Sequence, residues 1–365
     1  MFDQLPEYPW QQLVPFKKIA SEHPDGPIDL SIGSPVDPTP EIIKHALNQA
    51  SNSAGYPSAT GTQSLQQSIV NWFSSRRSVQ LGTTQVMPTV GSKEFISWLP
   101  IMLGLSKKDA VVQPRLAYTA YEVGAKFAGC ELVSEDDPNL WPENTKLIWI
   151  NSPSNPNGAV MSVSQMRNAV ARARELGAVL VSDECYAELG WQEGFESIAT
   201  PCLLQDEVTG GDMTNLLAIY SLSKQSNLAG YRAALAGGDE DLIQGLINLR
   251  KHAGLIVPSP VQAAMAAALA DYEHVAEQKA LYRNRLEVLS QALEEAGFEI
   301  ADCQGGLYLW VKVEDTFEAV QQFAEQGILV GPGEFYGEAG KGFVRLSVTA
   351  TDEDVQRASR RLKML

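Results

Sequence analysis

Short apolar runs alternate with amphipathic segments between residues 28 and 220 of the chain. A short apolar run bounded by turn residues is typical of a buried strand, whereas apolar residues that recur with the helical period predict a helix. The strands that we expect lie at residues 28–33, 86–90, 110–113, 131–134, 147–150, 178–182 and 216–220. The helices that we expect lie at residues 40–50, 63–76, 95–103, 121–128 and 164–176. Strands separated by helices indicate a mostly parallel sheet covered on both faces.

The pattern changes beyond residue 240. The elements that we expect there are helices at residues 241–252, 259–272, 274–296, 316–326 and 352–362, and strands at residues 305–311 and 343–347. We therefore predict an α/β protein with a large domain at residues 41–240 and a smaller α+β domain at residues 241–365. Residues 1–40 should form an N-terminal arm and part of the small domain.

Charge and composition narrow the classes of partner. Lys and Arg number 28 against 44 Asp and Glu among 365 residues, which gives a formal charge of −16 and argues against nucleic acid or an anionic membrane as a partner. No basic segment followed by an apolar run begins the chain, and the longest fully apolar run, residues 263–270, is too short to span a bilayer. We expect a cytoplasmic protein. The cysteines and histidines are dispersed without metal-binding spacing, so we expect no metal site.

Three of the expected strands end in polar clusters. These clusters contain, in chain order, Asn155, then Asp183 and Tyr186, and then Ser221, Ser223 and Lys224. In a parallel sheet between helices, ligands bind outside the carboxyl ends of the strands. The three clusters should therefore meet at one edge of the sheet and form a site.

Lys224 is the residue around which this site would be organised. Hydroxyl side chains flank it in the run Ser221-Leu222-Ser223-Lys224, and Arg232 follows. A lysine amine that burial and nearby positive charge help to deprotonate reacts with aldehydes, and hydroxyl and guanidinium groups bind phosphate. Pyridoxal 5′-phosphate (PLP) carries both an aldehyde and a phosphate, so this run suggests that cofactor. A surface lysine in a polar loop is the alternative interpretation.

Other residues offer what PLP further requires. Asp183 could keep the pyridine nitrogen protonated, Asn155 and Tyr186 could contact the ring oxygen, and the ring of Tyr118 could stack on the cofactor. The candidate phosphate ligands are Gly91, Ser92, Lys93, Ser221, Ser223 and Arg232. The first three of these open a helix, whose N-terminal amides suit a phosphate, although an ordinary capped helix explains that turn equally well.

Arg345 is the one charged residue of the expected strand at residues 343–347. A planar guanidinium binds a carboxylate through two hydrogen bonds, and an amino-acid substrate carries such a carboxylate. A partner in a structural ion pair is the alternative interpretation. The sequence thus offers a candidate substrate anchor in the second domain.

Four motifs together resemble the class I/II aminotransferases, which are the aspartate aminotransferase-like PLP enzymes of fold type I. The motifs are Asn155-Pro156-x-Gly158, Asp183-x-x-Tyr186, Ser221-x-Ser223-Lys224 with Arg232, and Phe343-Val344-Arg345-Leu346-Ser347. They occur in the family's order, and the resemblance runs from about Ile28 to the C-terminus. It implies the PLP-dependent transferase fold type I, with a mostly parallel sheet of the seven-stranded type between helices in the large domain.

The resemblance also implies roles for individual residues. Lys224 would carry PLP and move a proton to and from the substrate α-carbon, with Asp183 and Tyr186 as further catalytic residues. The positions that match substrate-binding residues are Gly33, Asn155 and Arg345. Tyr56 matches a tyrosine that reaches the phosphate from the neighbouring subunit, so the resemblance implies a homodimer with shared active sites. The proline that usually follows the stacking aromatic is missing after Tyr118.

The segment from His23 to Pro40 resembles the N-terminal signature of actinobacterial succinyldiaminopimelate aminotransferases, enzymes of lysine and cell-wall precursor synthesis. It implies ping-pong amino transfer between N-succinyl-LL-2,6-diaminopimelate and 2-oxoglutarate. The substrates would thus be a small-molecule amino acid and a 2-oxo acid. The alternatives are an aminotransferase for aspartate, alanine or an aromatic amino acid, a β-lyase of the same fold, and a non-catalytic PLP-binding regulatory module. Candidates for binding the distal carboxylates of the substrate are Lys17, Lys18, Arg115 and Lys341.

Overall fold

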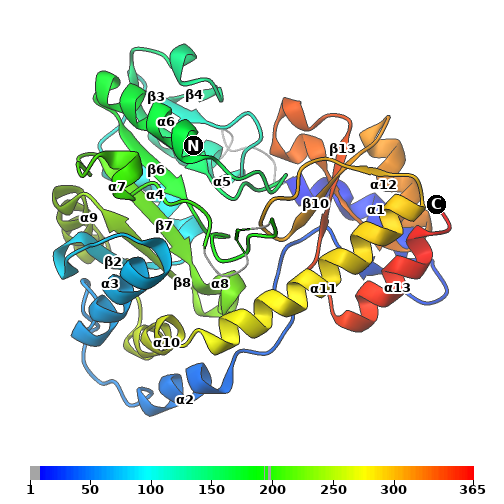
Figure 1. Cartoon of the computed structure of the whole chain (residues 1–365), viewed down its shortest axis with the longest axis horizontal. Coiled ribbons are helices and arrows are strands. Elements are labelled where there is room, and N and C mark those ends of the chain that lie inside the picture. Colours follow the sequence, from blue (N-terminus) through cyan, green and yellow to red (C-terminus); the bar gives the residue numbers. More distant parts are fainter. Residues whose placement is uncertain (1–8, 193, 196–198) are drawn as a thin grey trace.

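The largest element of the computed structural model is a seven-stranded sheet in the order β2-β8-β7-β6-β5-β3-β4 (Figure 1). The structure describes residues 9–192, 194–195 and 199–365, so the first eight residues of the expected arm lie outside it. β8 runs antiparallel to both of its neighbours, and the other pairs are parallel. The strands are β2 (Val86–Val90), β3 (Ala110–Gln113), β4 (Glu131–Ser134), β5 (Thr145–Asn151), β6 (Val179–Asp183), β7 (Leu216–Ser221) and β8 (Ala233–Gly238). The predicted mostly parallel sheet is confirmed.

Helices cover both faces of this sheet because its strands are apolar on both faces. In β5, Ile148 and Ile150 pack into one buried cluster, and Leu147 and Trp149 pack into another on the opposite face. The first cluster is covered by α3 (Gln63–Arg77), α6 (Val163–Leu176) and α10 (Ser259–Ala270), and the second by α4 (Ser92–Met102), α5 (Ala120–Ala128) and α9 (Glu240–Ala253). Outside these layers, α2 (Glu41–Gln49) packs on α10, and the short helices are α7 (Asp206–Thr209) and α8 (Leu222–Gln225).

A second, smaller set of sheets lies beside the first (Figure 1). It comprises an antiparallel sheet in the order β12-β13-β10-β9 and a parallel pair of β1 with β11. These strands are β1 (Ile28–Asp29), β9 (Glu299–Ile300), β10 (Tyr308–Lys312), β11 (Ile328–Leu329), β12 (Gly331–Pro332) and β13 (Phe343–Ser347). The helices that pack on them are α1 (Val14–Ser21), α11 (Glu273–Glu295), α12 (Thr316–Glu325) and α13 (Asp352–Leu362). The 3-10 helices are η2 (Pro9–Leu13), η3 (Thr83–Gln85), η4 (Pro138–Leu140), η5 (Ala229–Tyr231), η6 (Gly333–Tyr336) and η7 (Glu338–Gly340).

The first strand is shorter than the expected strand at residues 28–33. Strand pairing stops after Asp29, whose carboxylate accepts a hydrogen bond from the backbone N–H of Ser31 at 2.9 Å. This local bond gives the Ser31 amide a partner outside the sheet, so the chain no longer pairs with β11 at Ser31. The segment that follows therefore crosses toward the large sheet as an irregular loop.

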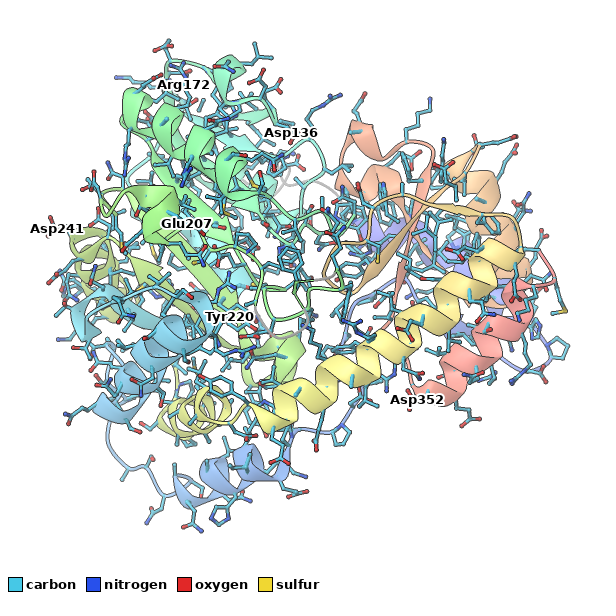
Figure 2. All side chains as sticks on the ribbon, viewed as in Figure 1. Asp136, Arg172, Glu207, Tyr220, Asp241 and Asp352 are labelled. Atoms are coloured by element: carbon cyan, nitrogen blue, oxygen red, sulfur yellow. The ribbon has the colours of Figure 1, made fainter. Side chains whose placement is uncertain are left out.

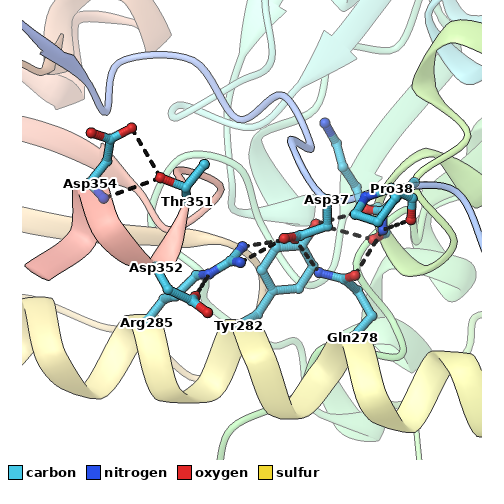
Figure 3. A network of polar contacts seen from close by, with 10 residues as sticks. Asp37, Pro38, Gln278, Tyr282, Arg285, Thr351, Asp352 and Asp354 are labelled. Carbon is cyan, nitrogen blue, oxygen red and sulfur yellow. Dashed lines mark hydrogen bonds and ion pairs between the residues drawn. The ribbon is translucent and has the colours of Figure 1, made fainter.

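A polar network ties that loop to the long helix α11 (Figure 3). Both terminal nitrogens of Arg285 donate to the carboxylate of Asp37, at 2.8 and 2.6 Å, and its Nε donates to Asp352 at 2.6 Å. Gln278 donates to the same Asp37 carboxylate at 2.9 Å. Arg285 of α11 therefore links the loop at residue 37 with the start of α13.

Two helices beyond residue 240 pack with the large sheet rather than with the smaller ones. α9 contacts β2 and β8, and α10 contacts α2 and α3. The domain boundary at residue 240 stays a prediction, and this packing favours a boundary nearer to α11. None of the helices in the described ranges combines the length and the apolar character that crossing a membrane requires.

Candidate active site

A cavity of about 300 Å³ lies at the carboxyl ends of β5, β6 and β7. Of the residues predicted for the site, it is lined by Gly33, Ser92, Lys93, Tyr118, Asn155, Asp183, Tyr186, Ser221, Ser223, Lys224, Arg232 and Arg345. Two predicted residues do not line it. Gly91 lies behind Arg232, and the side chain of Tyr56 is fully exposed on the loop between α2 and α3.

Lys224 lies in the short helix α8, which begins where β7 ends. The hydroxyl of Ser221 accepts a hydrogen bond from the backbone N–H of Ser223 at 3.2 Å and so turns the chain into that helix. The ammonium of Lys224 donates to the carbonyl of Gly33. Burial lowers the pKa of Lys224, and the positive charges of Arg345 and Arg232 lower it further. The amine is thus easier to deprotonate than an ordinary lysine, as a nucleophile or a base requires.

Asp183 is the last residue of β6 and is buried in the same cavity wall. One carboxylate oxygen accepts a hydrogen bond from the hydroxyl of Tyr121 at 2.8 Å, and the other accepts the N–H of Cys185 at 3.2 Å. Burial raises the pKa of Asp183, while the hydrogen bonds from Cys185 and Tyr121 lower it. A cationic group in the cavity would favour the ionised carboxylate still further. The arrangement fits a protonated ring nitrogen.

Arg345 reaches the cavity from β13, on the opposite side from Lys224. Its terminal nitrogens donate to the Asn155 side chain and to the carbonyl of Ser31, each at 2.7 Å, and its Nε is buried without a partner. Its guanidinium carbon lies 3.8 Å from the ring centre of Tyr308. In the part of the chain that the structure describes, Arg345 makes no ion pair with a carboxylate. Its charge therefore suits a carboxylate ligand better than a structural ion pair.

The remaining wall has the shape and the donors of a phosphate cradle. Gly91 has φ +82°, and a side chain there would overlap with the guanidinium of Arg232. Directly after Gly91, α4 begins at Ser92, and its first residues, Ser92 and Lys93, line the cavity, where the free amides of a helix N-terminus suit a phosphate. The hydroxyls of Ser221 and Ser223 lie 2.9 Å apart on the same wall. Hydroxyls, a guanidinium and helix amides together fit a phosphate, so the residues present fit PLP.

Comparison with known proteins identifies the family. The model of the aminotransferase class I and II family matches residues 25–362. This chain belongs to the class I and II aminotransferases. The resemblance inferred from the motifs and the predicted fold type are confirmed, and because the family is PLP-dependent, PLP is the cofactor.

Three relatives of this aminotransferase cover nearly the whole chain. It is 49% identical over 361 residues to the 4-dedimethylamino-4-oxo-anhydrotetracycline transaminase OxyQ of Streptomyces rimosus, an alignment that covers 98% of this chain and 99% of the relative. It is 45% identical to the probable aminotransferase Rv1178 of Mycobacterium tuberculosis, covering 98% of this chain and 85% of the relative. It is 31% identical to the LL-diaminopimelate aminotransferase of Aquifex aeolicus, covering 99% and 97%.

Solved structures show the same architecture. An aminotransferase from Neisseria meningitidis superposes with a TM-score of 0.90 at 27% identity, covering 100% of this chain and 98% of the other. A probable N-succinyldiaminopimelate aminotransferase from Thermus thermophilus superposes with a TM-score of 0.86 at 27% identity, covering 97% and 99%. The whole chain therefore has the aminotransferase fold.

Two tyrosines of the aminotransferase site escaped prediction from the sequence. Tyr121 bonds Asp183, and its helical spacing from Tyr118 was the only signal that both face one site. The hydroxyl of Tyr308 lies 3.1 Å from that of Tyr186. Burial alone would raise the pKa of Tyr308, but the charges of Arg345 and Lys224 outweigh burial and lower it. The strand that carries Tyr308 was predicted, but its register toward the site was not.

The site concentrates positive charge inside an acidic molecule. Carboxylates such as Asp136, Glu207 and Asp241 stand on the outer surface, whereas Tyr220 is buried (Figure 2). The cations in the cavity wall are Lys93, Lys224, Arg232 and Arg345, against the single carboxylate of Asp183. This local excess attracts anionic ligands despite the net charge of −16.

Proposed function

We propose that this aminotransferase exchanges an amino group between N-succinyl-LL-2,6-diaminopimelate and glutamate with their 2-oxo acids, in lysine and diaminopimelate synthesis. The observation that carries amino-acid transfer is that one cavity is lined by part-buried Lys224 and by Arg345, which makes no ion pair with a carboxylate of the described residues. The segment from His23 to Pro40 supports the succinylated donor, as do the Aquifex relative and the Thermus structure.

The residues of the cavity divide the work of this reaction. Arg345 would hold the substrate α-carboxylate and Asn155 would orient its guanidinium through their 2.7 Å hydrogen bond. When bound, PLP supplies an electron sink for the electron pair left at the α-carbon. The amine of Lys224 would take the α-proton as a general base and return a proton as a general acid. Asp183 would keep a positive charge on the ring nitrogen.

The proposal includes a cytoplasmic homodimer in which each subunit completes the other's site. Its support is Tyr56, whose side chain projects into solvent, 104% exposed, from the loop between α2 and α3. An aromatic residue that makes no contact with its own subunit gains by burial against another. Tyr56 would reach the phosphate cradle of the partner subunit.

A half-reaction screen tests the proposed donor. N-succinyl-LL-2,6-diaminopimelate, glutamate, aspartate and alanine are added separately to the purified PLP enzyme, and the absorbance of the cofactor is followed. We expect the first two to convert the spectrum fastest. Conversion by aspartate or alanine alone would overturn the proposed donor while leaving amino transfer intact. Release of pyruvate and ammonia from cystathionine without a 2-oxo acid would instead identify a β-lyase.

Replacement of Lys224 tests the proposed chemistry itself. Lys224→Ala removes the only amine that we place next to the reacting atoms, so we expect turnover to fall by about 10⁴-fold or more, together with loss of the lysine-linked absorbance. Lys93→Ala, which removes a neighbouring cavity amine, should retain that absorbance. Normal turnover by Lys224→Ala would refute the proposed role.

A second candidate acceptor comes from the relative at 49% identity, which is named for a tetracycline intermediate. In this alternative, the acceptor is the ketone of a polycyclic compound rather than a 2-oxo acid. The two candidates separate in the second half-reaction. The pyridoxamine form of the enzyme is mixed separately with 2-oxoglutarate, with the succinylated oxo acid and with 4-dedimethylamino-4-oxo-anhydrotetracycline. The acceptor that restores the PLP spectrum is then identified.

A further inference from the structure

A second cavity, of about 280 Å³, adjoins the one that contains Lys224. The two cavities share Lys93 and Thr119 as lining residues. The other walls of the second cavity come from the end of β3, the start of α5, η6 and the segment at residues 9–12. The shared walls place this cavity within reach of a long substrate whose reacting end lies at Lys224. None of the distal-carboxylate candidates Lys17, Lys18, Arg115 and Lys341 lines either cavity.

Gln113 places a buried acceptor in this second cavity. It is the last residue of β3, and strand ends of the same sheet supply Asp183 and Ser221 to the first cavity. Its side chain is only 8% exposed; Nε2 donates to the hydroxyl of Ser134 at 3.1 Å, but Oε1 is buried without a partner. A buried acceptor without a partner destabilises the protein, and a ligand N–H or O–H would offset that cost.

Glu334 supplies a second acceptor from the opposite wall. Its Oε2 is buried and has no hydrogen-bond partner. The 3-10 helix that carries it is held in place, because the backbone N–H of Ala117 donates to the carbonyl of Tyr336 at 2.8 Å. The ring of Tyr336 also lies 4.7 Å from the guanidinium carbon of Arg345. One short helix therefore supports the carboxylate-binding arginine and presents Glu334 to the second cavity.

The charges in the second cavity favour a ligand that donates hydrogen bonds. The cation in its wall, Lys93, already interacts with another group, and the other carboxylate, Glu122, pairs with Lys126 at 2.6 Å. Two acceptor oxygens, one of them on a carboxylate, remain buried without donors at Gln113 and Glu334. An apolar chain end would leave both unsatisfied, and a group with acceptors but no donor would face like partial charges.

We propose that the second cavity is a distal subsite, in which Gln113 and Glu334 accept hydrogen bonds from nitrogen at the far end of the amino donor. The donor is then a long-chain amino acid with either an amide N–H or an ammonium at its distal end. N-succinyl-LL-2,6-diaminopimelate has the first group, and diaminopimelate has the second. The inference rests on the proposed amino transfer at Lys224 and does not depend on which of these donors is used.

A matched series of amino acids tests the subsite. Norleucine, lysine and Nε-acetyllysine share an unbranched side chain but end in a methyl group, an ammonium and an amide, respectively. Each is mixed with the PLP enzyme in a stopped-flow spectrometer, and the rate of the cofactor absorbance change is measured against concentration. The resulting saturation curves separate the apparent Kd from the maximal rate. The variants are Glu334→Leu, Glu334→Gln and Gln113→Met, with Ser134→Ala as the control that removes only the bond to Gln113 Nε2.

We expect the wild-type enzyme to bind lysine or Nε-acetyllysine about 10-fold or more tightly than norleucine. Glu334→Leu and Gln113→Met should each reduce this preference by about 10-fold, and Ser134→Ala should retain it. Glu334→Gln keeps an acceptor but loses the charge, so it should weaken the preference for an ammonium far more than that for an amide. No preference in the wild-type enzyme, or a preference that survives in both Glu334→Leu and Gln113→Met, would overturn the subsite.

The same experiment separates failure of the subsite from failure of the proposed donor. An enzyme that prefers a nitrogen-bearing chain end but does not react with N-succinyl-LL-2,6-diaminopimelate retains the subsite and loses that donor. Thermal melting and the absorbance of bound PLP establish that each variant folds. If Glu334→Leu does not fold, Glu334→Gln and Gln113→Met decide the comparison, because both replacements preserve side-chain size.

Discussion

At the scale of single residues, burial acts in opposite directions on the two central ionisable groups. Burial lowers the pKa of Lys224, which favours the neutral amine that the proposed nucleophile and base requires. It raises the pKa of Asp183, which opposes the carboxylate that a protonated ring nitrogen requires. The hydrogen bonds from Cys185 and Tyr121 counteract burial at Asp183. The hydroxyl of Tyr121 therefore positions the Asp183 carboxylate and lowers its pKa.

Removal of that hydroxyl gives a prediction for activity and its pH dependence. Because the Tyr121 hydroxyl lowers the pKa of Asp183, Tyr121→Phe should raise it, so the carboxylate is protonated at a higher pH. We expect kcat/KM to fall by about 10- to 100-fold and its acid limb to move to higher pH. Tyr272→Phe, whose hydroxyl contacts Ser75 instead, is the control. An unchanged pH profile in Tyr121→Phe would contradict this role.

Two glycines with a positive φ separate the shape of the phosphate cradle from backbone strain. Gly91 and Gly104 have φ +82° and +72°, but an added side chain overlaps with Arg232 only at Gly91 and meets nothing within 4 Å at Gly104. Both alanine variants should lose stability, because a positive φ disfavours any side chain. Gly91→Ala should also weaken PLP binding to the apoenzyme by about 10-fold or more, because Arg232 must move. Equal Kd values for PLP in the two variants, from absorbance titration, would refute the cradle.

At the scale of elements, the sequence predicts most strands and helices because their apolar periods are regular. This reasoning missed β8 in the large sheet and the two-residue strands β9, β11 and β12 in the smaller sheets. β8 is the longest of these. Its sequence, Ala-Ala-Leu-Ala-Gly-Gly, has no β-branched or aromatic residue. It forms a strand because β2 and β7 pair with it on both sides, and its small residues fit beneath a helix: a side chain at Gly237 would overlap with Phe73 and Leu81. Tertiary pairing, which a single segment does not encode, decided its structure.

The site residues show the same contrast between what local sequence predicts and what tertiary pairing decides. Lys224, Asp183 and Asn155 were found because each follows a strand whose end lies at a known edge of a parallel sheet. Tyr308 is the first residue of β10 in the smaller sheet, where the direction of a side chain depends on register. Gln113 ends β3 at the same edge, and the order of the strands would have been needed to include it.

The network at Arg285 gives a prediction at this scale, because its two carboxylate partners differ in burial. The side chain of Asp37 is 14% exposed and that of Asp352 is 59% exposed. Asp37→Asn should cost about 1–3 kcal/mol of unfolding free energy at pH 7, and Asp352→Asn about 0.5 kcal/mol or less. Urea unfolding at fixed protein concentration measures both. Equal losses in the two variants would contradict the difference in burial.

The Asp37 prediction also has a pH signature. Burial alone would raise the pKa of Asp37, but the hydrogen bonds from Arg285 and Gln278 outweigh it and hold the pKa below its ordinary value of 3.8. A lowered pKa in the folded state stabilises the protein above the unfolded-state pKa, and this stability is lost as pH falls through the folded-state pKa. The stability difference between wild type and Asp37→Asn should therefore be constant above about pH 5 and shrink below about pH 4.

At the scale of the whole molecule, the active site lies where the two sets of sheets meet. The large sheet supplies Lys224 and Asp183, and the smaller sheet supplies Arg345 and Tyr308. In the proposed reaction, substrate recognition and proton transfer would thus come from separate layers, which α11 connects (Figure 1). In the proposed dimer, Tyr56 of the partner subunit would add a third source of site residues.

Mixing two inactive variants tests whether the site is shared between subunits. Tyr56→Ala should lose cofactor affinity and most activity, and Lys224→Ala should be inactive. In a mixed dimer, one site combines Lys224 of the first variant with Tyr56 of the second and is therefore intact, whereas the other site carries both replacements. Random exchange of subunits should restore about a quarter of wild-type activity, because half of the dimers are mixed and each has one intact site. If Tyr56 acted within its own subunit, or if the protein were a monomer, mixing would restore nothing. Sedimentation of the mixture, with the two variants carrying different tags, measures the fraction of mixed dimers against which the recovered activity is normalised.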